Sequence, residues 1–374
     1  MTAAPPQRHP DQAGTPGARS ETFAVLADGT PVERWTLRSD NAVTATVLTL
    51  GATLHTWQTP DRDGRHVNIV LGSDDFATVL GPARHFGTIV GRYANRIADS
   101  RFTLDGTEHR VAPTGRGVTL HGGPDGFAHR VWQAEEVPAA PGGAAVRFSL
   151  HSPDGDQGFP GALDATATYT LGADGALTVE YHATADRPTV VNLTNHAYFN
   201  LAGEGTGDVL GHHLTVDADH YTPVDDRMVP LGPYEPVAGT PFDFTSARAI
   251  GERIHDDHPQ LRQADGYDHN WVLRPRPADG VPARAALLHH PASGRTLEVR
   301  TTEPGIQVYT GNTFDGRVTG FGGTAYTPYS GVALETQHHP DSPNHPDYPS
   351  TVLRPGGEFR STTVFRPGVA SREP

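Results

Sequence analysis

The sequence has no cysteine and only two methionines among its 374 residues. The absence of cysteine excludes a disulfide framework, a thiolate metal site and a cysteine nucleophile. No stretch approaches the ~18 consecutive apolar residues of a membrane-spanning helix, and residues 1–20 lack the apolar run of a signal peptide. We therefore expect no membrane partner, and a cytoplasmic location is the default expectation.

Positive charge is also scarce in this chain. It carries 29 basic and 43 acidic residues, which gives a formal net charge of -14. Nucleic-acid binding requires clustered basic side chains that meet phosphates. The charge balance therefore argues against a nucleic-acid partner, and an acidic surface mainly favours solubility.

Residues that break helices are abundant, with 42 glycines and 33 prolines. Apolar and polar residues alternate at 43–47, 165–171 and 177–182, which is the pattern of half-buried strands. The last two runs flank a Gly-containing turn at 172–175, which predicts an antiparallel hairpin. Helical periodicity is weak, and 247–254 is the best candidate for a short helix. The pattern predicts an all-β fold.

The chain shows one clear change in composition, near its N-terminus. Residues 1–20 are rich in Pro, Gly, Ala and polar residues, and we expect them to form a disordered tail. No internal repeat and no Pro- or Ser-rich linker divides residues 21–374. We therefore expect these residues to form one large, mainly antiparallel β-domain whose loops carry the function.

Several polar clusters lie beside strand-like sequence and glycine turns. Taken singly, each cluster also fits an ordinary structural role, such as a turn cap or a hydrogen-bonded histidine. Glu335 follows the apolar or small residues 331–334, so we expect a half-buried carboxyl with a raised pKa. The other clusters are GRYANR at 91–96, LHGG at 120–123, NLTNHAYFN at 192–200 and GYDHNW at 266–271.

A metal site is the first interpretation to weigh for the segment after Glu335. His338, His339 and His345 lie there with Asp341 and Asp347 nearby, and imidazole and carboxylate ligands would suit zinc or another divalent ion. The regular ligand spacing of a metal site is missing, however. We favour a polar, Pro-rich loop and expect no metal.

Taken together and in order, the clusters resemble the aldose 1-epimerase family, the galactose mutarotases. The resemblance covers nearly the whole chain after the tail, and several long motifs in order are more specific than any one of them. The matching segments are GRYANRIA at 91–98, LHGGPDGFAHRVW at 120–132, SPDGDQGFPGAL at 152–163, VVNLTNHAYFNLAG at 190–203, GYDHNW at 266–271, PGIQVYTGN at 304–312 and LETQHHPDSPNHPDYPSTVLRPGGEF at 334–359.

This resemblance implies a large antiparallel β-sandwich that interconverts the α and β anomers of free aldoses such as glucose and galactose. It implies that Glu335 is the general base and His196 the general acid. A carboxylate and an imidazole beside the two sugar oxygens suffice for ring opening, so we expect neither a metal nor an organic cofactor. The resemblance further implies that a set of polar residues holds the sugar hydroxyls and ring oxygen. These are Asn95, Arg96, His121, Asp268 and Gln307.

Sugar pockets also tend to cover the apolar face of the ring with an aromatic side chain. Aromatic candidates beside the polar clusters are Tyr198, Phe199, Tyr267 and Trp271. We expect most of them to be buried in the core instead.

Other functions remain open at this point. A glycoside hydrolase would use Glu335 and Asp268 as its two carboxylates, and a non-catalytic carbohydrate-binding domain would keep the pocket without turnover. A phosphosugar epimerase would need a further cationic cluster beside the motifs, and the sequence shows none. The oligomeric state is undetermined.

Overall fold

The largest sheet of the protein has nine antiparallel strands, and the computed structural model describes residues 15–275, 277 and 280–371. The strand order in this sheet is β11 (Gln133–Val137), β12 (Ala144–Ser152), β13 (Leu163–Leu171), β14 (Leu177–Ala185), β28 (Phe359–Val369), β24 (Arg295–Thr301), β23 (Ala283–His289), β18 (His213–Val216) and β21 (Arg248–Ala249).

Two smaller sheets and four ribbons complete the described strands. The six-stranded sheet has the order β17 (Tyr198–Phe199), β26 (Val332–Gln337), β25 (Gly305–Tyr309), β22 (Asp268–Leu273), β19 (Ala218–Thr222) and β20 (Glu235–Pro236). The five-stranded sheet has the order β1 (Gly17–Val25), β2 (Pro31–Arg38), β3 (Thr44–Leu48), β4 (Thr53–Pro60) and β5 (His66–Asn68). The ribbons pair β6 (Ile89–Val90) with β16 (Thr194–Asn195), β7 (Arg96–Ala98) with β10 (Val118–Leu120), β8 (Arg101–Leu104) with β9 (Thr107–Arg110), and β15 (Thr189–Val190) with β27 (Val352–Leu353).

The predicted hairpin is confirmed as β13 and β14. The two strands pair without interruption from Leu163 opposite Ala185 to Leu171 opposite Leu177. Alternate residues of β13 are buried, while the polar residues between them keep some exposure. This alternation gives the sheet one apolar face and one face toward water.

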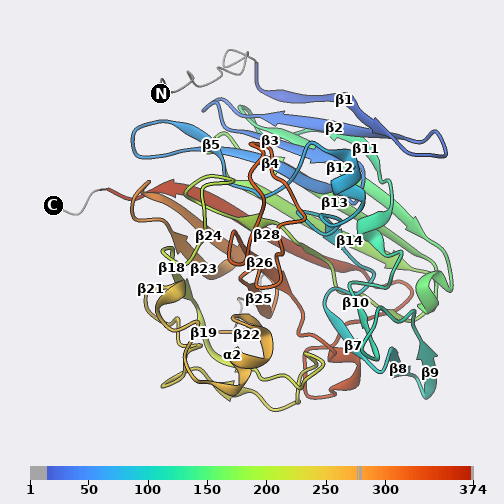
Figure 1. Ribbon diagram of the computed structural model, residues 1–374. Helices are drawn as coiled ribbons and strands as arrows, with labels where there is room; N and C mark the ends of the chain where they lie inside the picture. The colour runs from blue at the N-terminus through green and yellow to red at the C-terminus, as the bar shows by residue number, and fades with distance from the viewer. Residues whose placement is uncertain (1–14, 276, 278–279, 372–374) are drawn as a thin grey trace.

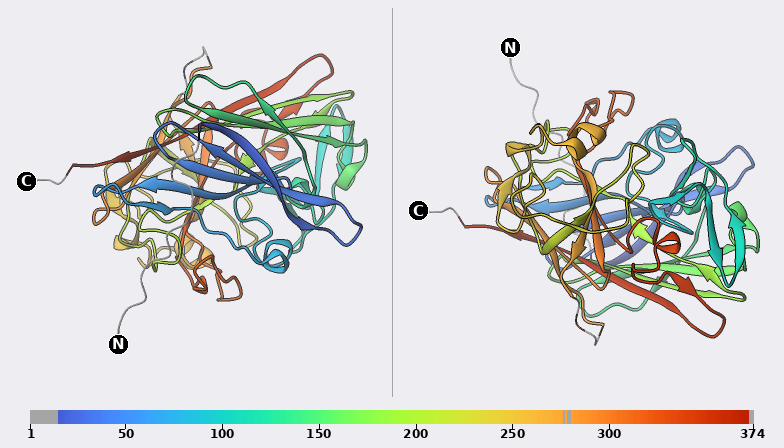
Figure 2. Two further views of the ribbon diagram at one scale, coloured as in Figure 1. Left: turned by 90° about the horizontal axis from the view of Figure 1, so that it is seen from above. Right: turned by 90° about the horizontal axis from the view of Figure 1, so that it is seen from below.

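The apolar face of the nine-stranded sheet packs against the other two sheets. Just beyond β5, Val70 forms an isolated bridge with Phe199, which joins the five-stranded sheet to the edge of the six-stranded one. Phe199 packs on Phe365 of β28 with ring centroids 5.4 Å apart, and the hydroxyls of Thr336 in β26 and Thr363 in β28 hydrogen-bond across the layers. Figure 1 shows the five-stranded sheet in blue at the top and β22 and β25 below. The protein is an antiparallel β-sandwich, and Figure 2 shows it from above and below.

Helices are short and few within the described residues. They are α1 (Phe76–Leu80) and α2 (Pro259–Ala264), and neither has the length or apolar character that a membrane crossing requires. The short helix predicted at 247–254 is wrong: β21 and a 3-10 turn at Ile250–Glu252 occupy it. The reason is tertiary, because the N–H groups of Ile250 and Gly251 donate to His212 and Leu210 instead of to a preceding helical turn.

Strand β1 corrects the predicted extent of the N-terminal tail. Residues 17–20 belong to β1 and pair with residues 35–38 of β2. Most β1 side chains keep substantial exposure, so backbone hydrogen bonds order this edge strand, and composition does not reveal them. Residues 1–14 of the predicted tail lie outside the described residues.

Arg92, from the GRYANR segment, is a structural residue. Its side chain is buried, and its guanidinium donates to the carbonyl oxygens of Pro160 at 3.0 Å and Gly161 at 2.8 Å. It also donates to the hydroxyl of Ser152 at 2.7 Å. Burial lowers the pKa of Arg92 to about 10, although nearby aspartates oppose the change. Arg92 thus fastens the loop that follows β12 to the segment that leads into the β7 ribbon.

We predict that Arg92→Met lowers the free energy of unfolding by roughly 3 kcal/mol or more, because several buried acceptors lose their donor. Chemical denaturation monitored by fluorescence measures the change. Arg110→Met is the matched control, since Arg110 is 74% exposed and forms an ion pair with Glu108 at the surface. Its effect should stay within about 0.5 kcal/mol, and an equally small effect of Arg92→Met would contradict the assigned role.

Candidate active site

Three neighbouring strands of the six-stranded sheet present one polar face. In β22, β25 and β26 alternate residues point to opposite faces, and Trp271, Val308 and Leu334 pack into the core. The register places Gln307 opposite Glu335 on one side and opposite Asn270 on the other. The sheet therefore gathers polar side chains that are distant in sequence. They are Asp268, Asn270, Gln307, Tyr309, Glu335 and Gln337.

Glu335 of β26 meets His196, which directly follows β16. His196 Nε2 and Glu335 Oε1 lie 3.6 Å apart, and the two side chains are 6% and 2% exposed. The backbone of His196 is held on both sides, because its N–H donates to Thr88 and its carbonyl accepts from the N–H of Gly87, each at 2.9 Å. The imidazole and the carboxyl are thus fixed side by side, away from bulk water.

Burial disfavours the charged form of both partners. It raises the pKa of Glu335 well above its ordinary value, with the charge of Asp268 adding to the effect and Arg96 opposing it. It lowers the pKa of His196 to about 4, although a backbone hydrogen bond and Asp268 oppose the change. The pair therefore favours holding a single proton, because two protons would charge His196 and none would charge Glu335.

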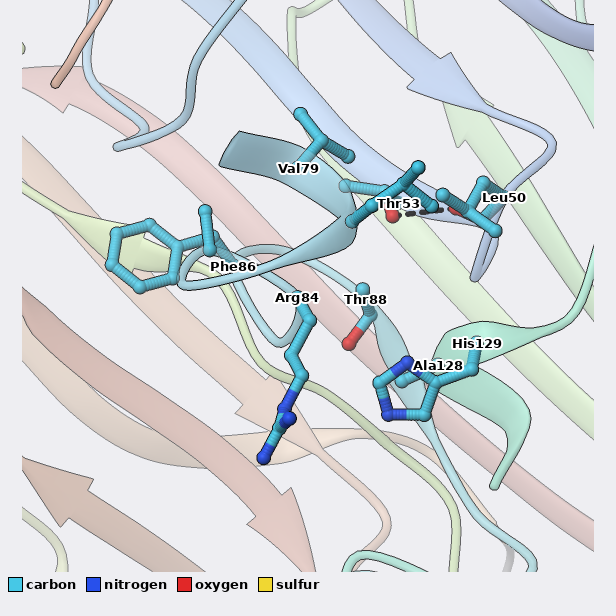
Figure 3. Close-up of a pocket in the computed structure, with 10 residues that line it drawn as sticks. Leu50, Thr53, Val79, Arg84, Phe86, Thr88, Ala128 and His129 are labelled. Atoms are coloured by element: carbon cyan, nitrogen blue, oxygen red, sulfur yellow. Dashed lines mark hydrogen bonds between the residues drawn. The ribbon is translucent and has the colours of Figure 1, made fainter. Parts of the chain in front are cut away.

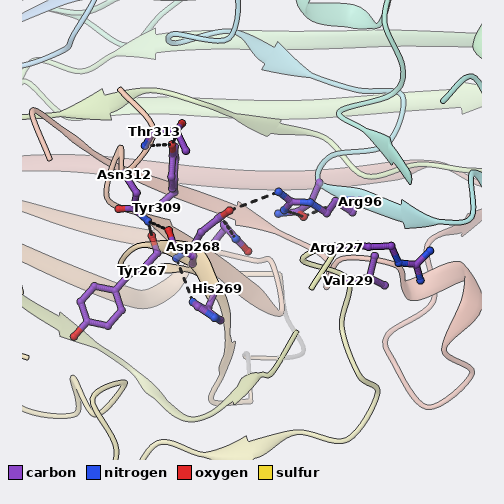
Figure 4. Close-up of polar contacts among 12 residues, drawn as sticks. Arg96, Arg227, Val229, Tyr267, Asp268, His269, Tyr309, Asn312 and Thr313 are labelled. Atoms are coloured by element: carbon purple, nitrogen blue, oxygen red, sulfur yellow. Dashed lines mark hydrogen bonds and ion pairs between the residues drawn. The ribbon is translucent and has the colours of Figure 1, made fainter. Parts of the chain in front are cut away.

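A second polar group surrounds Asp268. Gln307 Nε2 donates to Asp268 Oδ1 at 2.7 Å, and Arg96 Nη2 lies 3.6 Å from Asp268 Oδ2. Figure 4 shows Arg96 reaching toward Asp268 from another part of the chain. Gln307 Oε1 and Glu335 Oε2 are buried and have no hydrogen-bond partner within the described residues. A buried acceptor of this kind is costly unless a ligand or water satisfies it.

His121 is held in one tautomer by Asn95. The N–H of His121 donates to the Asn95 carbonyl at 3.0 Å, and the Asn95 N–H donates to His121 Nδ1 at 3.2 Å. Because Nδ1 accepts, the neutral ring carries its proton on Nε2. Gly122 makes this turn possible, since a Cβ there would lie 2.0 Å from the carbonyl oxygen of Gly91. His121 thus offers the site a hydrogen-bond donor.

Within the part of the chain that the structure describes, one group of side chains could hold a metal ion. His121, His196 and Glu335 each place a ligand atom within 4.8 Å of the others. The tautomer of His121 opposes this use, because a metal on Nε2 would require a proton on Nδ1, where the Asn95 N–H already donates. Among the residues that the structure describes, none accepts from His196 Nδ1 as the outer partner of a metal-bound imidazole would. The three residues fit a hydrogen-bonding site better than a metal site.

The histidines after Glu335 point to separate protein partners instead of a common centre. This arrangement agrees with the loop interpretation of the segment, because each imidazole is already engaged. The closest contacts are Glu303 to His338 at 2.6 Å, Asp341 to His345 at 3.3 Å and Asn270 to His339 at 3.1 Å.

The structure brings the seven candidate residues into one neighbourhood through the contacts above. Of the four aromatic candidates, Tyr198 lies at the site, with its ring 5.0 Å from that of His196, and the other three belong to the core. Sequence reasoning missed Asn270, Gln337 and Tyr309. The period-two pattern could have found them, because each lies two residues along its strand from a candidate.

We predict that Glu335→Gln stabilises the protein at neutral and alkaline pH. The folded state binds the Glu335 proton more tightly than the unfolded chain does, so wild-type stability falls as pH rises through the raised pKa. The melting temperature of the variant should exceed that of the wild type by about 2 °C or more at pH 8. The difference should vanish below the ordinary carboxyl pKa of 4.5.

The control for this measurement is Glu180→Gln, at an exposed position of β14. Its melting temperature at pH 8 should stay within about 1 °C of that of the wild type, because substitutions at exposed positions change stability little. A Glu335→Gln variant that melts below the wild type at pH 8 would contradict the assigned burial cost.

Comparison with known proteins relates the chain to one family. The family model of aldose 1-epimerase matches residues 33–366. The chain is 42% identical over 342 residues to galactose mutarotase of Rattus norvegicus, covering 91% of this chain and 96% of that protein. It is 41% identical over 349 residues to aldose 1-epimerase of Escherichia coli K12, covering 93% and 98%.

Solved structures agree with these matches. Galactose 1-epimerase from Lactobacillus acidophilus superposes with a TM-score of 0.83 at 27% identity, covering 96% of this chain and all of that one. An aldose epimerase homologue from C. elegans superposes with a TM-score of 0.79 at 33% identity, covering 88% and 96%. The sheets, the site and the matched length lead to one assignment: the chain belongs to the aldose 1-epimerase family.

Proposed function

We propose that the protein is a mutarotase that interconverts the α and β anomers of free aldoses, and that Glu335 and His196 are its proton-transfer pair. The observation that carries the proposal is the approach of His196 Nε2 to within 3.6 Å of Glu335 Oε1 in a buried setting. The sugar hydroxyl O1 and the ring oxygen O5 are bonded to the same carbon, C1. A base and an acid that serve both oxygens must therefore lie side by side.

In the proposed reaction, Glu335 takes the proton from the O1 hydroxyl as C1 and O1 form the carbonyl double bond. The C1–O5 bond breaks, and O5 takes the proton from His196. Rotation about C1–C2 then presents the other face of the aldehyde. On closure His196 takes the proton back from the O5 hydroxyl, and Glu335 returns one to O1, so the site ends as it began.

This cycle uses the single proton that the pair favours. Before ring opening the proton is on His196, and in the open-chain state it is on Glu335. The buried, sugar-free pair favours the second arrangement, because both of its members are then neutral. A bound cyclic sugar favours the first, since its O1 hydroxyl donates to the Glu335 carboxylate and its ring oxygen accepts from the imidazolium.

The remaining candidates hold the sugar. Arg96 and the Nε2 proton of His121 are hydrogen-bond donors for oxygens of the sugar. Asp268 accepts hydrogen bonds from sugar hydroxyls, and Gln307 fixes its orientation. Tyr198 packs beside His196 and supplies an apolar surface for the ring. Asp268 is thus occupied by an amide and a guanidinium, which suits hydroxyl binding better than the acid role that a glycoside hydrolase would require.

Polarimetry of freshly dissolved α-D-glucose and α-D-galactose tests the function. The wild type should accelerate mutarotation without releasing any group from a glycoside. Glu335→Gln and His196→Gln should each lower kcat by about a hundredfold to ten-thousandfold, because each removes one proton-transfer group.

The same assay separates the alternatives. Glu180→Gln, in the exposed face of β14, should keep the wild-type rate. Retained sugar binding with no acceleration by the wild type would indicate a carbohydrate-binding protein, and release of sugar from a glycoside would indicate a hydrolase. Undiminished activity of Glu335→Gln would place the base elsewhere.

A further inference from the structure

A third imidazole lies against the two histidines of the site. His85 is in the loop between α1 and β6, outside every motif that sequence reasoning selected. Its ring centroid is 5.2 Å from that of His121 and 6.3 Å from that of His196, on which it stacks. His85 is partly exposed, so it borders the space that a sugar held by His121 and His196 would occupy.

The loop of His85 is fastened to the strand that carries His196. Gly87 donates its N–H to the carbonyl of His196 at 2.9 Å, and its own carbonyl accepts from the N–H of Leu54 at 2.8 Å and from Asn195 Nδ2 at 2.6 Å. Gly87 has φ +76°, and a Cβ there would lie 2.1 Å from the Leu54 carbonyl oxygen. His85 is therefore held at a fixed place relative to the catalytic pair.

The chemical state of His85 suits hydroxyl binding. Burial lowers its pKa well below the ordinary value, and the charges of His196 and His129 act in the same direction. The ring is thus neutral at physiological pH, with one nitrogen that donates and one that accepts. Its Nδ1 is buried without a hydrogen-bond partner in the described chain.

We propose that His85 is a sugar-binding residue that hydrogen-bonds one hydroxyl of the aldose and thereby contributes to substrate preference. This inference rests on the proposed mutarotase function. The reaction already has its acid and its base, so His85 contributes binding that is equal in the cyclic and open states. Its loss should therefore raise KM and leave kcat nearly unchanged.

The cavity next to the His85 loop is too small for a sugar. Its volume is about 60 Å³, far below the ~300 Å³ of small ligand pockets. Figure 3 shows Arg84, Phe86 and His129 at its border. His129 lines this cavity, and its ring centroid lies 5.4 Å from that of His85. His129→Phe therefore serves as the control, because it removes an imidazole next to His85 from the side of this cavity.

The test compares His85→Phe with His129→Phe by polarimetric kinetics on glucose, galactose and their singly deoxygenated forms. His85→Phe keeps a flat ring and removes hydrogen bonding. It should raise KM about three- to tenfold for the parent sugar, which corresponds to the loss of one hydrogen bond, with kcat within about twofold. The effect should disappear for the deoxy sugar that lacks the contacted hydroxyl. His129→Phe should match the wild type.

Each outcome is informative because the wild type is measured first. A wild type without mutarotation refutes the proposed function, whereas an active wild type with an unchanged KM in His85→Phe for every aldose overturns the role of His85. A fall in kcat at constant KM also overturns it. His85→Gln, which keeps a donor and an acceptor, should stay within about threefold of the wild-type KM, and a tenfold rise in a folded variant would contradict the hydrogen bond.

Discussion

Glu335 occupies a sheet face from which water is largely removed, and its carboxyl keeps a raised pKa even with Arg96 nearby. A lone buried charge costs several kcal/mol, so the site resists ionising Glu335 and equally resists protonating His196. A single proton on Glu335 avoids both costs, because both side chains are then neutral. The chemistry proposed for Glu335 and His196 follows from this constraint. As the C1–O5 bond breaks, Glu335 takes a proton from O1 and His196 gives one to O5, so the pair holds one proton before and after the step.

The sandwich supplies the rigidity that this arrangement needs. In β26 the side chains alternate between two tasks: Leu334 and Thr336 join the core and the facing β28, while Glu335 and Gln337 face the site. A shift of one residue in register would exchange the two sets. The strand pairing that stabilises the core is thus the same pairing that aims the carboxyl at His196.

Part of this could be predicted from the sequence. Alternation predicted the β13–β14 hairpin, and the apolar run before Glu335 predicted a half-buried carboxyl, because both signals are local. The structure buries Glu335 further than that, to 2% exposure. The pairing of Glu335 with His196 required the family resemblance, since these residues are far apart in sequence and the register of a ribbon and a sheet brings them together. The helix predicted at 247–254 was wrong, because tertiary hydrogen bonds hold this segment in another conformation. The start of β1 was missed, because backbone hydrogen bonds to β2 order it.

The roles of two further side chains could not be predicted from the sequence. Arg92 stands in a polar motif yet serves as a buried tie, and His85 stands in no motif yet touches two site histidines. Residue type alone does not separate these cases, because arginine and histidine take part in both stability and binding. What separates them is which atoms lie within hydrogen-bond reach, and that depends on the packed loops.

The most direct test of the single-proton account is the pH dependence of kcat/KM for the wild-type protein. The account predicts a bell-shaped profile. The rate falls toward acid because His196, whose pKa is lowered to about 4, becomes protonated while Glu335 is protonated as well. The rate falls toward alkali because the pair loses its last proton. The alkaline limb should lie well above the ordinary carboxyl pKa. A rate that stays level or rises with pH through the alkaline range would show that the unprotonated pair is competent, and would contradict the account.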